Sequence, residues 1–143
     1  MVFGGGRRVG AAGVRVASEA GAQPRVLVVD DEPRMGRALE RLLAHRYAVT
    51  VVASAREALE AVAAGPPFAA ILCDLMMPEM TGMDLHEALA RTDPPLAGRM
   101  VFMTGGAYTD RAQAFLDRMP GRRLDKPFRP DDLERVLSGV VGG

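Results

Sequence analysis

The stretch AAILCDLMMP, residues 69–78, decides the fold of this 143-residue chain. Five apolar residues run up to the carboxylate of Asp74, and Pro78 follows four positions later. A short segment that is apolar at every position is typical of a strand buried on both faces. Because open α/β sheets bind their ligands at the carboxyl ends of the strands, we expect Asp74 to lie at a functional site.

Similar apolar segments alternate with segments of helical periodicity along the chain, and Pro94 and Pro95 are expected to end the third helix. The alternation indicates a parallel sheet with right-handed crossovers and helices on both faces. We predict an α/β, flavodoxin-like single domain, with a five-stranded parallel sheet of order 2-1-3-4-5 flanked by five helices. The predicted strands are residues 25–29, 47–52, 68–73, 99–103 and 122–125.

Composition narrows the class of protein. Residues 1–24 are rich in Gly, Ala and Arg without periodicity, so we interpret them as a flexible N-terminal extension or linker before a domain at 25–143.

A formal net charge of zero argues against a general nucleic-acid binder. No apolar run approaches the roughly 18 residues of a membrane span. The single cysteine, Cys73, excludes a disulfide framework and fits a reducing cytosol. We therefore expect a cytoplasmic protein without membrane insertion.

Polar residues follow four of the predicted strands at one edge of the sheet. Asp30 and Asp31 come after the first strand, and Asp74 comes after the third. Thr104 follows the fourth strand, and Lys126, the only lysine among 18 basic residues, follows the fifth. These strands are neighbours in the predicted order, so the five side chains are expected to converge on one site.

The residue types at this edge suit phosphoryl transfer. Three adjacent carboxylates are tolerated when a cation lies among them, and oxygen ligands suit Mg²⁺ or Mn²⁺. The carboxylate of Asp74 can act as a nucleophile and form an aspartyl-phosphate. The ammonium of Lys126 and the hydroxyl of Thr104 can each neutralise a phosphoryl oxygen. Gly105 permits the close backbone approach that a phosphoryl oxygen needs.

The pairs Asp30-Asp31 and Thr104-Gly105, the segment 74–78 and Lys126-Pro127-Phe128 together resemble the response-regulator receiver domain of two-component signalling. The resemblance covers about residues 25–139 and is closest to receivers of hybrid sensor histidine kinases. It implies a phosphorelay role, in which Asp74 takes a phosphoryl group from a histidine kinase or a histidine phosphotransfer protein.

The same resemblance assigns the other roles. Asp31 would bind Mg²⁺ directly, Asp30 through water, and Met76 through its backbone carbonyl. Thr104 would be the switch hydroxyl, Lys126 would bind phosphate, and the Lys126-Pro127 peptide bond would be cis. The resemblance further implies a phosphoprotein that phosphorylates itself and slowly dephosphorylates itself, without turnover on an outside substrate.

Two features depart from the family's pattern. Arg123 stands where the family usually has an aromatic residue that couples to Thr104. It either is solvated, which we favour slightly, or swings toward a phosphate or a partner's carboxylate. No output domain follows residue 143, so we expect either that the signal leaves through contacts with a downstream protein partner or that the chain is a fragment of a larger protein. A homodimer is also possible.

Two other functions compete with the phosphorylation switch. One is a phosphorylation-independent scaffold, which the complete polar cluster disfavours. The other is a phosphatase with an aspartyl-phosphate intermediate. Such enzymes typically carry a second aspartate two residues after the nucleophile, where this chain has Met76 and therefore lacks a ready general acid or base.

Overall fold

Strands and helices alternate along the chain because apolar runs with β-branched residues alternate with amphipathic segments. The computed structural model describes residues 23–106 and 109–142; residues 1–22 of the predicted extension lie outside this range. The elements are β1 (Arg25–Val29), α1 (Pro33–Leu43), β2 (Ala48–Val52), α2 (Ala55–Ala64), β3 (Ala70–Asp74), α3 (Gly82–Thr92), α4 (Pro94–Ala97), β4 (Met100–Thr104), α5 (Asp110–Asp117), β5 (Arg123–Asp125) and α6 (Pro130–Gly142).

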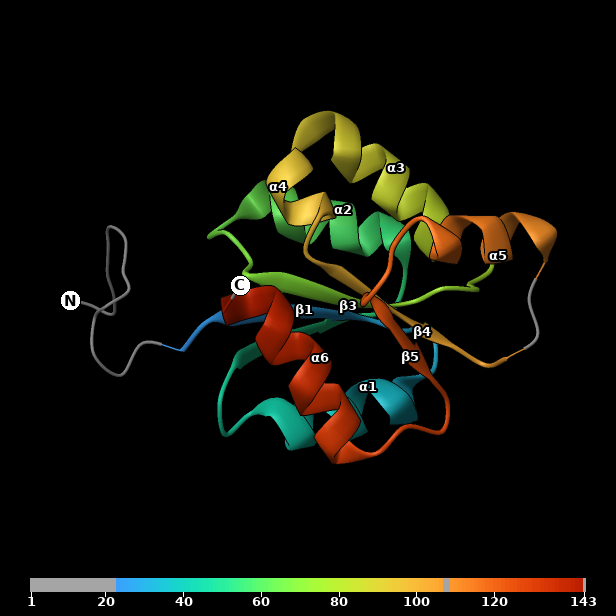
Figure 1. Cartoon of the computed structure of the whole chain (residues 1–143). Coiled ribbons are helices and arrows are strands. Elements are labelled where there is room, and N and C mark those ends of the chain that lie inside the picture. Colours follow the sequence, from blue (N-terminus) through green and yellow to red (C-terminus); the bar gives the residue numbers. More distant parts are fainter. Residues whose placement is uncertain (1–22, 107–108, 143) are drawn as a thin grey trace.

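The five strands form one parallel sheet in the order β2-β1-β3-β4-β5, which confirms the predicted order. Helices α1 and α6 cover one face, and α2, α3, α4 and α5 cover the other (Figure 1). Alternate strand residues enter the two cores because successive side chains of a strand point to opposite faces. Leu27 and Ile71, for example, pack in the core under α2 to α5, whereas Val28 and Leu72 pack under α1 and α6.

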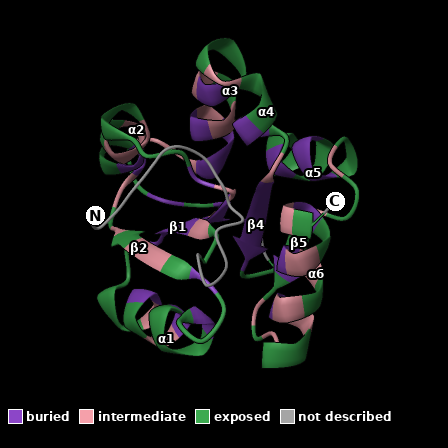
Figure 2. Cartoon of the chain, turned by 90° about the vertical axis from the view of Figure 1, so that its left-hand side faces the viewer, coloured by how far each residue is buried: buried purple, intermediate pink, exposed green. Residues whose placement is uncertain are grey.

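Burial differs sharply between the centre and the edge of the sheet. All five residues of β4 are buried, whereas β2 has no buried residue and Val51 is 37% exposed (Figure 2). A strand between two neighbours and beneath two layers of helices loses contact with water on every side, whereas an edge strand keeps one open side. The predicted site residues lie at or directly after the ends of β1, β3, β4 and β5, and none of them lies on β2.

The prediction of five helices was wrong, because the described part of the chain contains six. The additional helix is the single turn α4. Asp93 caps it by accepting a hydrogen bond from the backbone N–H of Leu96 at 3.4 Å, and Pro94 suits its first position. Leu96 and Ala97 are buried against the core, so burial stabilises a turn that two prolines suggested would be a helix end.

The ends of two strands also differ from the prediction. Asp74 is the last residue of β3 and pairs with Met103, and Thr104 is the last residue of β4 and pairs with Asp125. The backbone N–H of Leu75 then donates to the carbonyl of Met103 at 2.9 Å. The hydrogen-bonded ladder therefore holds both site residues, rather than leaving them on loops.

The start of α3 lies directly against the end of β3. A Cβ on Gly82 would meet the backbone oxygen of Asp74 at 2.8 Å and the Cα of Leu75 at 3.1 Å. Only glycine allows this approach, and the Gly82 N–H uses it to donate to the Leu75 carbonyl at 2.9 Å. The loop after Asp74 is thereby closed back onto the strand. No helix in the described ranges is long and apolar enough to cross a bilayer.

Candidate functional site

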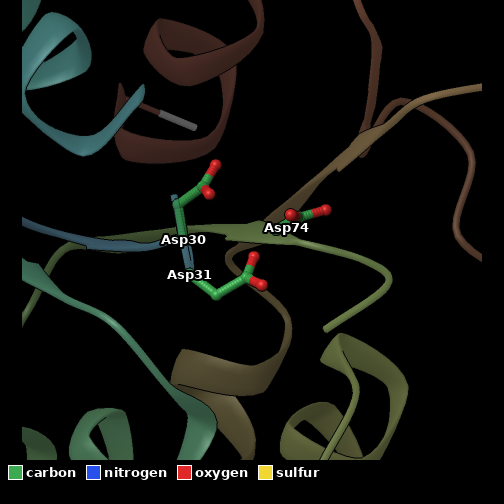
Figure 3. Close-up of side chains that lie close together, drawn as sticks. All are labelled: Asp30, Asp31 and Asp74. Atoms are coloured by element: carbon green, nitrogen blue, oxygen red, sulfur yellow. The ribbon is translucent and has the colours of Figure 1, made fainter. Parts of the chain in front are cut away.

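Three aspartates from two strand ends come together at the carboxyl edge of the sheet (Figure 3). Asp30 and Asp31 follow β1, and Asp74 ends β3, which is hydrogen-bonded to β1. Each of the three offers a carboxylate oxygen within 4.8 Å of the others. The structure therefore brings together the acidic residues that the sequence placed at this edge.

Asp30 is the buried member of the cluster, with 2% of its surface exposed. Its Oδ1 accepts the backbone N–H of Glu32 at 2.8 Å, whereas its Oδ2 accepts no hydrogen bond from the residues that the structure describes. Burial raises the pKa of Asp30, opposed by the Glu32 hydrogen bond and by the charge of Lys126. A buried carboxylate oxygen without a donor is costly, so this atom is suited to a positively charged or hydrogen-donating ligand.

Lys126 lies between two of the carboxylates. Its Nζ is 3.7 Å from Oδ2 of Asp30 and 3.7 Å from Oδ2 of Asp74. Burial raises the pKa of Asp74, while Lys126 lowers it and Asp30 raises it further. One ammonium thus pairs with two of the three clustered carboxylates, and negative charge remains in excess at the site.

This donor set fits a hard divalent cation. Carboxylate oxygens suit Mg²⁺ or Mn²⁺, and the Asp30 oxygen that accepts no hydrogen bond lies at the cluster. An open cleft of about 350 Å³ gives access to it. The cleft is lined by Asp31, Glu32, Asp74, Met76, Gly105 and Lys126.

Asp30→Asn should raise the free energy of unfolding by about 1 kcal/mol at pH 7 in metal-free buffer, because it removes a buried, under-paired charge. Because folding raises the pKa of Asp30, the folded state favours the protonated carboxyl. This contribution to the free energy of unfolding is lost as pH rises through the folded-state pKa. The gain from the variant should therefore shrink as pH falls through that pKa. Urea unfolding across pH measures it, with Asp117→Asn on α5, outside the acidic cluster, as control. A less stable Asp30→Asn at pH 7 would contradict the account.

Thr104 ends β4, the strand next to β3, but its hydroxyl is bonded to a residue outside the acidic cluster. Thr104 is 1% exposed, and its hydroxyl donates to Oδ1 of Asp125 at 2.8 Å. Arg123 donates to the same oxygen through Nε at 2.9 Å. Asp125 is not among the predicted site residues. Opposite charges at positions 123 and 125 of one strand lie on the same face and could have indicated the pair.

The Lys126-Pro127 peptide bond is cis, as the resemblance implied. Gly65-Pro66 is also cis, which the sequence analysis did not predict.

Comparison with known proteins shows the family and the fold. The model of the family described as "Response regulator receiver domain" matches residues 26–138. Two-component response regulator ORR11 from Oryza sativa subsp. indica is 35% identical over 138 residues, which cover 96% of this chain and 94% of that protein. Transcriptional regulatory protein TcrA from Mycobacterium tuberculosis is 39% identical over 112 residues, covering 76% of this chain and 42% of TcrA.

Solved structures share the architecture. A response regulator receiver domain protein from Clostridium thermocellum has a TM-score of 0.74 and 23% identity, over 83% of this chain and 94% of the other. A sensor protein from Polaromonas sp. JS666 has a TM-score of 0.73 and 29% identity, over 85% of this chain and 98% of the other. The sheet order and the helix layers described above are thus shared with these chains.

Proposed function

The chain belongs to the family of response regulator receiver domains, and from this premise we propose that Asp74 accepts a phosphoryl group from a phosphohistidine donor with the help of Mg²⁺. The observation that carries the proposal is the position of the Lys126 ammonium, 3.7 Å from both Asp74 and Asp30, beside an open cleft. The carboxylate nucleophile, the Lys126 ammonium and the acidic residues thus lie beside the same open cleft.

The chemistry assigned to Asp74 is a displacement at phosphorus. A carboxylate oxygen of Asp74 attacks the phosphorus of a phosphoimidazole, the P–N bond breaks, and its electron pair goes to the imidazole nitrogen, which takes a proton from solvent. Asp74 is half-buried and lines the cleft, so the donor can reach it. Lys126 offsets the charge of the transferred group as a point charge.

Asp31 is proposed as the direct metal ligand, because it is the exposed member of the acidic cluster and lines the cleft. Asp30 is proposed to act through water, and the backbone carbonyl of Met76 to complete the set. When bound, the metal ion supplies positive charge to a transferring phosphoryl oxygen. Thr104 and the backbone at Gly105 are proposed to bind the remaining oxygens of the phosphorylated state.

The signalling partners follow from this chemistry. A histidine kinase or a histidine phosphotransfer protein is the donor, and a downstream protein receives the signal through changed contacts. We propose that the protein works in the cytoplasm, where phosphohistidine donors act. The buried free thiol of Cys73 fits a reducing compartment. Attachment to a hybrid kinase and homodimer formation stay predictions. The scaffold and phosphatase alternatives are not favoured by the family match.

A small phosphodonor tests the proposal directly. Incubation with acetyl phosphate and Mg²⁺ should add one phosphoryl group per chain by intact mass, and hydroxylamine should remove it, because hydroxylamine cleaves acyl phosphates but not phosphate esters of serine or threonine. Sustained release of phosphate from a generic phosphoester would instead favour the phosphatase, and absence of any added mass would reject phosphorylation at Asp74.

A further inference from the structure

The hydroxyl of Thr104 is held by Asp125 of the neighbouring strand β5, and Asp125 is in turn bonded to Arg123. Thr104 and Asp125 are partners in the β4–β5 ladder, and the hydroxyl donates to Oδ1 of Asp125 at 2.8 Å. Arg123 lies on the same face of β5 and donates to that oxygen at 2.9 Å, with a second contact to Oδ2 at 3.5 Å. Asp125 thus accepts from both residues at once.

A threonine hydroxyl has one proton to donate. Thr104 therefore cannot donate to Asp125 and to a phosphoryl oxygen on Asp74 at the same time. The backbone of Thr104 is fixed by the sheet, since its carbonyl accepts the N–H of Lys126 at 2.7 Å. The side chain must accordingly leave Asp125 if it is to bind a phosphoryl group.

We propose that Asp125, oriented by Arg123, is a positioning residue that competes with the phosphoryl group for the Thr104 hydroxyl. The proposal rests on the function assigned to Asp74 above. In the unphosphorylated protein Asp125 holds the hydroxyl away from the acidic cluster. In the phosphorylated protein the hydroxyl changes partner, and Asp125 keeps its hydrogen bond from Arg123 but loses the one from Thr104.

The exposed position of Asp125 lets water satisfy its carboxylate after the Thr104 hydroxyl leaves. The side chain of Asp125 is 59% exposed, so water can replace the hydroxyl when Thr104 leaves. The hydrogen bond from Arg123, and after it the one from Thr104, hold the pKa of Asp125 below its usual range. The carboxylate is therefore charged at neutral pH and is a strong acceptor until it is displaced.

A double-mutant cycle on the full chain tests the competition. The probe is beryllofluoride with Mg²⁺, a stand-in for a phosphoryl group on Asp74, and its affinity is measured by ¹⁹F NMR titration. Asp125→Ala should tighten beryllofluoride binding by roughly threefold to tenfold, as expected for the loss of one competing hydrogen bond. In a Thr104→Val background, Asp125→Ala should change the affinity less than about twofold.

Two controls separate competition from charge and from folding. Asp117→Ala removes an exposed carboxylate of α5 that accepts from Gln113, and it should leave the affinity unchanged. Thr104→Ser keeps a hydroxyl and should restore the effect of Asp125→Ala. If Asp125→Ala tightened binding equally in the parent chain and in Thr104→Val, simple charge removal would explain the gain and the proposal would be overturned. No gain in either background would also overturn it.

A second measurement needs no phosphate analogue. NMR titration of the Asp125 carboxyl carbon should show a higher pKa in Thr104→Val than in the parent chain, and a higher pKa again in Arg123→Gln. An unchanged pKa in Thr104→Val would overturn the proposed hydrogen bond. The parent chain could bind no beryllofluoride while the pKa of Asp125 changes as expected. That result would confirm the hydrogen bond between Thr104 and Asp125, but it would reject both the function assigned to Asp74 and the competition that rests on it. If beryllofluoride binds but the cycle shows no coupling, only the competition fails.

Discussion

Asp74→Asn should abolish phosphorylation by acetyl phosphate, with at least about a 100-fold lower rate, because the amide has no carboxylate oxygen to attack phosphorus. The change is nearly isosteric, so the cleft and the remaining ligands keep their places. Intact mass after incubation with Mg²⁺ measures the result.

The loss cannot be attributed to misfolding. Burial and the neighbouring Asp30 raise the pKa of Asp74, so its charge is unfavourable in the folded protein without metal, and Asp74→Asn should unfold at an equal or higher temperature. Asp117→Asn, on the exposed end of α5, serves as the matched control and should be labelled as fully as the parent chain. Undiminished labelling of Asp74→Asn would place the phosphoryl group on another residue.

Removal of Mg²⁺ should have the second large effect. A chelator should stop labelling by acetyl phosphate, because three carboxylates and an incoming phosphoryl group cannot share one cleft with a single ammonium. Asp31→Asn should weaken Mg²⁺ binding by more than about tenfold, since outer-shell partners alone are worth about 10–100-fold in other metal sites. Isothermal titration with Mg²⁺ measures the affinity without any phosphodonor.

The binding of Mg²⁺ should also depend on pH. Asp30 and Asp74 have raised pKa values, and a protonated carboxyl does not bind the metal well, so the increase in Tm caused by Mg²⁺ should fade as pH falls through those pKa values. Glu32→Gln is the control, because Glu32 lines the cleft but lies outside the acidic cluster. Full Mg²⁺ affinity in Asp31→Asn would show that Asp31 is not a ligand.

The acidic residues and the lysine of the site were predictable because each lies at the end of a strand or directly after it. In a parallel sheet all strands end at one edge, so the order of the strands alone places Asp30, Asp31, Asp74 and Lys126 together. The structure places Asp30, Asp31 and Asp74 within reach of one another, with Lys126 between Asp30 and Asp74.

The helix count failed for a physical reason. Two successive prolines after Asp93 are read from sequence as the end of a helix, but proline is also favourable in a first helical turn. The choice depended on whether Leu96 and Ala97 had a core to enter. Both belong to the same buried cluster as Leu89 of α3 and Met100 of β4. Packing between separate elements cannot be read from the sequence pattern of residues 93–97 alone.

The sequence by itself determined the strand order, the two layers of helices and the edge at which the polar residues gather, because periodicity and the ends of apolar runs encode them. Only the tertiary structure decided how each polar atom at the end of β3 and β4 is used. Within the described residues, one buried oxygen of Asp30 has no hydrogen-bond donor, and the Thr104 hydroxyl donates to Asp125, 21 residues away. Burial and hydrogen-bond partners depend on neighbouring strands and rotatable side chains. The position of Asp74 therefore followed from its strand, whereas the partner of Thr104 did not.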